Sequence, residues 1–219
     1  MRPSGEVARL TRIGLGLALF TIAYNLAEGA LSVWAGRGAD LAVMVGFGLD
    51  SFIESLVAVL VALRLAGRLR GGADEDRERA EFRTLRAVAV SFWVLAAWLT
   101  WEGASGLIGG AEPERSWPAI AVLVASLVVM PALWRAKVTV GRRLGGDRLI
   151  LSDAAETRIC LLMTASALIG IVAFELTGWG GFASLASLVI AVIAVQEGRE
   201  SWEGELVEDG DDDGAADGD

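Results

Sequence analysis

The chain alternates long apolar runs with short polar segments. Six runs are long enough to cross a bilayer, which takes about 20 residues in a helix. They lie near residues 13–35, 41–63, 87–109, 118–138, 149–176 and 181–197. Because lipid offers the backbone no hydrogen bonds, a spanning run of this kind folds as a helix. The pattern therefore predicts an all-α, polytopic membrane protein with six transmembrane helices.

The first apolar run is a helix of the protein rather than a signal peptide. It is too long, contains Asn25 and Glu28, and lacks a small-residue cleavage site after a short apolar region. We therefore expect three parts: a cytoplasmic N-terminal segment (1–12), a six-helix transmembrane domain (13–200) and a cytoplasmic tail (201–219).

Basic residues concentrate on alternate connections between the runs. Three arginines precede the first run, seven lie between residues 64 and 86, and five basic residues lie between 135 and 148. The other connections hold only Arg37 and Arg115. By the positive-inside rule, both termini are predicted to be cytoplasmic.

Tryptophan positions agree with this topology. Trp34, Trp117 and Trp179 fall near the predicted outer boundary, and indole rings favour the membrane interface. The chain has 18 arginines and one lysine, a usage typical of GC-rich prokaryotic genes. We therefore expect a multi-pass protein of a prokaryotic cell membrane.

The net charge of −9 belongs to the tail. Residues 201–219 hold nine acids and no base, so the preceding residues are neutral overall. The tail has too little apolar surface to fold and is predicted to be disordered. We expect no nucleic-acid partner. With no histidine, imidazole-based catalysis is excluded, and the lone Cys160 has no partner for an intrachain disulfide.

Two acids interrupt the second apolar run. Asp50 and Glu54 are four residues apart and so share one face of a helix. A charge near the bilayer centre costs roughly 3 kcal/mol on insertion scales, so a cation, either protons or a metal ion, must neutralise the pair. Gly46 and Gly48 just before them predict close helix packing rather than phosphate binding.

The fifth run repeats this arrangement with Glu156 and Cys160. If the second and fifth helices pack antiparallel, both pairs lie at similar depth. Three oxygens and one sulfur then form a tetrahedral site of the kind that zinc prefers. Asp153 lies one turn nearer the cytoplasm, where it either contacts an incoming ion or stabilises the helix start.

Further polar residues occupy the first, third and fifth runs. Asn25 and Glu28 lie one turn apart, and they form a proton path, support the metal ligands, or only bond a neighbouring helix. Glu102 and Glu175 lie closer to the predicted outer ends, where water is within reach. We expect these two to be structural.

The six runs and the phrases GLDSFIES and LSDAAET resemble the cation diffusion facilitator family over residues 12–200. The resemblance implies a homodimeric antiporter that moves a divalent transition metal, usually zinc, out of the cytoplasm in exchange for protons. It places the metal ligands at Asp50, Glu54, Glu156 and Cys160, with Asp153 at a preceding acidic position. The chain departs from the family pattern in using a cysteine and no histidine. We also expect no C-terminal metal-sensing domain, so the membrane helices would supply the dimer interface.

Together these features predict a secondary active transporter, not an enzyme, that needs no bound cofactor. Its expected partners are the lipid bilayer, divalent metal ions, protons and a second copy of the chain. One alternative is a carrier of another cation in which Cys160 only packs. Another is a non-transporting partner or metal sensor whose buried acids fix helix contacts. A membrane hydrolase is disfavoured because it would need an open coordination position and a separate general base.

Overall fold

A computed structural model of the chain describes residues 5–70, 75–110 and 113–203, with side chains described except at 75–85, 148, 149 and 152. The acidic tail that the sequence predicts lies outside the described residues from residue 204 onward. Residues 201–203 belong to the last helix.

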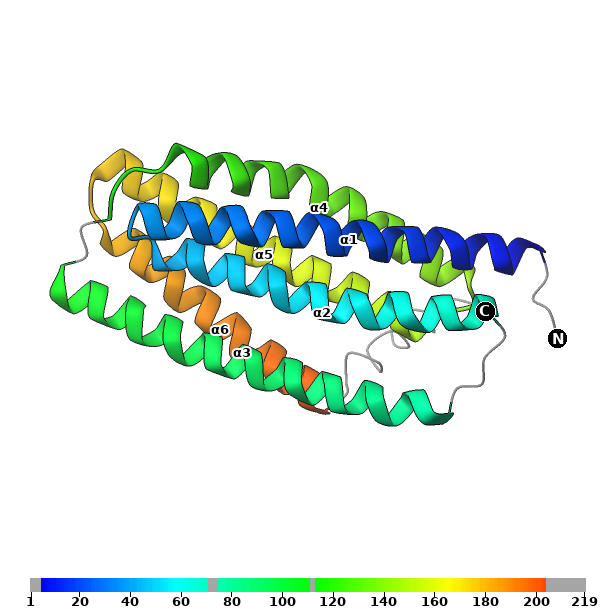
Figure 1. The fold of residues 1–219 in the computed structure, drawn as a ribbon. Coiled ribbons are helices and arrows are strands. Elements are labelled where there is room, and N and C mark those ends of the chain that lie inside the picture. The colour runs from blue at the N-terminus through cyan, green and yellow to red at the C-terminus, as the bar shows by residue number, and fades with distance from the viewer. Residues whose placement is uncertain (1–4, 71–74, 111–112, 204–219) are drawn as a thin grey trace, which may run out of the picture.

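The described residues form six helices, as predicted. They are α1 (Gly5–Gly38), α2 (Ala42–Arg70), α3 (Glu75–Gly109), α4 (Trp117–Arg143), α5 (Arg148–Thr177) and α6 (Gly181–Glu203). Each is long and apolar enough to cross a membrane. Successive helices run in opposite directions along one bundle (Figure 1). The all-α, six-span architecture is therefore confirmed.

Several helices extend beyond the apolar runs. The first helix begins at Gly5, so most of the predicted N-terminal segment is helical. The second helix continues to Arg70 and the third begins at Glu75. Hydropathy marks where lipid contact ends, whereas backbone hydrogen bonding carries a helix on into the interface. The apolar pattern therefore locates the spans but shortens the helices.

The second helix has a central place in the bundle. It packs against α1, α3, α5 and α6, and α3 and α6 also pack against each other (Figure 1). The fourth helix packs against α1 and α5. The predicted site helices α2 and α5 are therefore neighbours, each flanked by further helices.

A polar contact fixes α2 and α5 at one end of the bundle. The Asp147 side chain accepts a hydrogen bond from the Ile150 backbone amide at 3.3 Å and so caps the start of α5. The same carboxylate forms an ion pair with Arg68 near the end of α2. One side chain therefore starts α5 and links it to α2.

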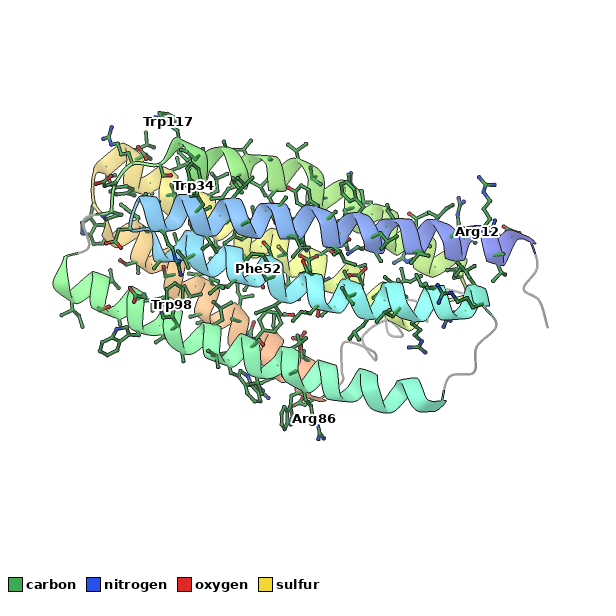
Figure 2. The ribbon with its side chains drawn as sticks, viewed as in Figure 1. Arg12, Trp34, Phe52, Arg86, Trp98 and Trp117 are labelled. Carbon is green, nitrogen blue, oxygen red and sulfur yellow. The ribbon has the colours of Figure 1, made fainter. Side chains whose placement is uncertain are left out.

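Charged and aromatic residues mark opposite ends of the bundle. Arg12 lies toward the end where α1 begins, whereas Trp34 and Trp117 lie at the other end (Figure 2). Both tryptophans are largely exposed, at 65% and 75%. This separation agrees with the predicted membrane boundaries. The cytoplasmic side and the homodimer stay predictions.

The first two helices cross with their backbones in close approach. A Cβ atom added at Gly48 would lie 2.8 Å from the Gly29 carbonyl oxygen, and one added at Gly29 would lie 2.8 Å from that of Gly48. These distances are too short for any side chain, so both positions require glycine. The close packing predicted at Gly48 is confirmed.

We expect Gly48→Ala to destabilise the protein by about 1–3 kcal/mol, because the added methyl group meets backbone that has no room to move. Thermal unfolding in detergent measures the effect. Gly16→Ala is the matched control, since nothing lies within 4 Å of its added Cβ and alanine favours helix. An unfolding temperature equal in the two variants would contradict the tight crossing.

Candidate cation site

The site begins with two buried carboxylates on α2. Asp50 and Glu54 are each 3% exposed, although they belong to the residue types that are almost never fully buried without a partner. Their spacing of one helical turn stacks both groups along the same side of α2. Their burial confirms that these acids point into the bundle.

The fifth helix meets α2 at the same depth. The Thr157 hydroxyl lies 2.9 Å from Glu54 Oε1 and donates a hydrogen bond to it. Cys160 is 1% exposed and lies close enough to interact with the carboxyl groups of both Asp50 and Glu54. The antiparallel match between α2 and α5 that the sequence predicts is therefore confirmed.

Glu156 is buried beside a carboxylate that the sequence analysis missed. It is 5% exposed, and both of its oxygens lack a hydrogen-bond partner among the described residues. It interacts electrostatically with Glu197 of α6 and with Glu54. Glu197 is itself 3% exposed. The sequence signal was a lone acid at the edge of the sixth apolar run.

Oxygen donors are available in this region but do not yet enclose an ion. Asp50 Oδ2 and Glu54 Oε2, like the Glu156 oxygens, have no hydrogen-bond partner among the described residues. Within the described part of the chain, no group of three or more histidine, cysteine, aspartate or glutamate side chains is already arranged to hold a metal ion. The ligand set Asp50, Glu54, Glu156 and Cys160 therefore stays a prediction.

A buried lysine stands next to these acids. Lys137 is the chain's only lysine, and its place among the basic residues between 135 and 148 predicts a cytoplasmic position. That assignment was wrong, because the structure buries Lys137 completely within the bundle. Lysine is almost never fully buried unless it is paired, so its partners explain its place.

Lys137 reaches from α4 to both site helices. Its Nζ lies 2.9 Å from Asp153 Oδ1 and 4.0 Å from Glu54 Oε1. It also donates a hydrogen bond of 2.8 Å to the Thr157 hydroxyl. At an effective dielectric constant near 20, two unit charges 4 Å apart attract by about 4 kcal/mol before their desolvation is subtracted. We call Lys137, Asp153, Thr157 and Glu54 the lysine network.

The pattern of α4 contained a signal for Lys137. The buried positions of this helix include Met130, Leu133, Lys137 and Val140, which follow the spacing of one helical face. A lysine on the apolar stripe of a spanning helix faces the bundle rather than water. Charge alone does not reveal this signal, because it groups Lys137 with the neighbouring arginines.

The two buried polar residues of α1, Asn25 and Glu28, differ in their hydrogen bonds. Ser51 donates a hydrogen bond of 3.1 Å to Glu28 Oε2, so Glu28 contacts the residue next to Asp50. Asn25 is completely buried, and both of its amide atoms lack a partner among the described residues. A bond to the neighbouring helix is therefore seen for Glu28 and not for Asn25.

We call the end of the bundle that holds Trp34 and Trp117 the tryptophan end. There, Glu175 accepts a hydrogen bond of 3.1 Å from the Ser116 backbone amide. Its other oxygen lies 3.5 Å from the Arg115 Nε atom. These contacts join the end of α5 to the start of α4, in agreement with the structural role expected for this residue.

Comparison with known proteins adds one finding to this geometry. The family model for the cation efflux transmembrane domain matches residues 15–203, which is nearly all of the described chain. The match spans all six helices and includes every residue of the lysine network. No curated protein matches the chain.

We expect Thr157→Val to destabilise the protein by about 1–3 kcal/mol, because both Lys137 and Glu54 lose a buried hydrogen-bond partner. Thermal unfolding in detergent measures this loss. Thr139→Val is the matched control, since the exposed Thr139 hydroxyl donates to the Arg135 carbonyl of its own helix and to no other described residue. Equal unfolding temperatures for the two variants would show that the hydrogen bonds of Thr157 add no stability.

Proposed function

Because the chain belongs to the cation efflux family, we propose that it exports a divalent transition-metal ion, most readily zinc, in exchange for protons. Members of this family are transporters, not enzymes. The observation that carries the proposal is a set of buried carboxylate oxygens that have no hydrogen-bond partner among the described residues, beside a thiol, on two adjacent membrane helices. Such groups need a cation for their charge to be neutralised.

The proposed ligands are Asp50 and Glu54 of α2 with Glu156 and Cys160 of α5. They offer three carboxylates and one thiolate, a donor set that suits tetrahedral zinc or cadmium better than magnesium or manganese. Because the groups are near one another without enclosing an ion, binding would draw α2 and α5 side chains together. This closing movement would distinguish the loaded state from the empty one.

Proton exchange follows from the same burial. When the metal leaves, the carboxylates stay away from water, and protons are the cations that restore neutrality. Metal and protons would therefore occupy the site in turn. If the bundle alternates between openings on the two sides, this competition lets a proton gradient drive metal export.

The structure also offers support for a rival role. Lys137 and Ser51 give structural partners to Asp153 and Glu28, as expected if buried acids only hold helices together. A non-transporting membrane protein would use such contacts for assembly alone. It would have no flux to lose when a site carboxylate is neutralised.

We expect Asp50→Asn to abolish zinc-driven proton movement in proteoliposomes, because the substitution keeps the shape and removes the charge. A pH-sensitive dye inside the vesicles measures the exchange. Glu102→Gln is the control, since Glu102 lies outside the proposed ligand set toward the tryptophan end and should keep flux near the wild-type level.

The opposite result is equally clear. Folded wild-type protein that moves no zinc, cadmium, manganese or cobalt would overturn the transport proposal and leave the structural role.

We expect Cys160→Ser to reduce cadmium and zinc transport relative to manganese and cobalt, because a hydroxyl is a harder ligand than a thiolate. Flux with each metal, compared as ratios in the same vesicles, measures the shift. Ala167→Ser is the control: it adds a hydroxyl to another buried position of α5. Unchanged ratios in Cys160→Ser would mean that the thiol only packs.

A further inference from the structure

Lys137 belongs to none of the ligand pairs on α2 and α5, yet it reaches both helices. We propose that Lys137 is a positioning residue that competes with the transported cation for Glu54. Its ammonium group acts as a tethered cation that holds this carboxylate in the empty site. The inference rests on the proposed function and deepens it, because it assigns a residue of α4 to the control of metal affinity.

The contacts of Lys137 have unequal strength. Its Nζ is 2.9 Å from Asp153 Oδ1 but 4.0 Å from Glu54 Oε1. Thr157 lies between the two interactions, because its hydroxyl accepts from Lys137 at 2.8 Å and donates to Glu54 Oε1 at 2.9 Å. Lys137 therefore interacts only weakly with Glu54, and both this contact and the Thr157 hydrogen bond are made to Oε1. Glu54 Oε2 has no hydrogen-bond partner among the described residues.

This geometry allows Lys137 to give up its contact with Glu54 and still keep Asp153 as its counter-ion. A metal ion on Glu54 repels the ammonium group and satisfies the carboxylate, while Asp153, at 2.9 Å from Nζ, keeps Lys137 neutralised. When the metal leaves, Lys137 again provides a positive charge for Glu54. The lysine therefore lowers the affinity for metal and favours release.

The same contacts assign a role to Asp153. Its charge is committed to Lys137, so it acts through the lysine rather than as a ligand for an incoming ion. If Asp153 is neutralised, Lys137 has only Glu54 as its charged partner in the network and competes more strongly with the metal. If both residues are neutralised, Glu54 is free for the metal.

Neutralising Lys137 and Asp153 together distinguishes a lysine that competes with the metal from an ion pair that is purely structural. A single Lys137→Met change leaves Asp153 buried without a counter-ion, so misfolding would be expected from that alone. The double variant Lys137→Met with Asp153→Asn removes both charges together and keeps net charge constant. Lys137→Gln with Asp153→Asn is a second neutral pair that keeps polar side chains at both positions.

The experiment measures zinc binding to the purified full chain, by competition with a fluorescent zinc indicator, and zinc-dependent flux in proteoliposomes. We expect the double variants to lower both the zinc Kd and the KM by about tenfold, which equals about 1.4 kcal/mol, with a lower kcat. Asp153→Asn alone should raise the Kd. Arg115→Met with Glu175→Gln removes an ion pair outside the network and serves as the matched control.

Each other outcome overturns the inference. A double variant that binds zinc like the wild type would make the Lys137–Asp153 pair purely structural. One that binds zinc as weakly as Asp153→Asn would make Asp153 a direct ligand. If instead the folded wild type neither binds nor moves zinc, the proposed function fails first, and Asp50→Asn then matches the wild type.

Discussion

The architecture depends on the high free energy of unneutralised charge inside a membrane. The central helix α2 carries Asp50 and Glu54, and several residues packed around them help to meet that demand. Cys160 and Thr157 approach from α5, and Lys137 supplies a positive charge from α4. None of these neighbours satisfies all of the carboxylate oxygens. The bundle therefore leaves part of the buried carboxylate charge without a positive partner, which is the property a cation carrier requires.

A glycine crossing and one ion pair stabilise the fold although this carboxylate charge is not fully neutralised. The backbones of α1 and α2 touch at Gly29 and Gly48, where neither crossing residue carries a side chain, so α2 gains a tight neighbour. The Arg68–Asp147 ion pair fixes α2 to the start of α5 at one end of the bundle. The site helices are thus held by contacts outside the site, and the acids between them need not provide the packing energy.

Much of the fold was readable from the sequence, because lipid allows few solutions. Apolar runs of membrane length locate all six helices, and the spacing of Asp50 and Glu54 predicts a shared helical face. The matched depth of α2 and α5 also follows from counting residues along antiparallel helices. Lys137 was missed because charge alone does not say whether a residue near a helix end faces water or the bundle. Glu197 was missed because it closes an apolar run, and only the packing of α6 against α5 shows that it is buried.

The glycine crossing has a consequence for how the bundle is able to move. Because Gly29 and Gly48 bring the two backbones into contact, α1 and α2 are expected to move together. A movement that exposes the carboxylates is then expected where α2 faces α5, an interface that contains the hydrogen bond from Thr157 to Glu54. The bonds that hold the empty site together are then the same bonds that a change of access must break, so the opening of the bundle is tied to the occupancy of Glu54.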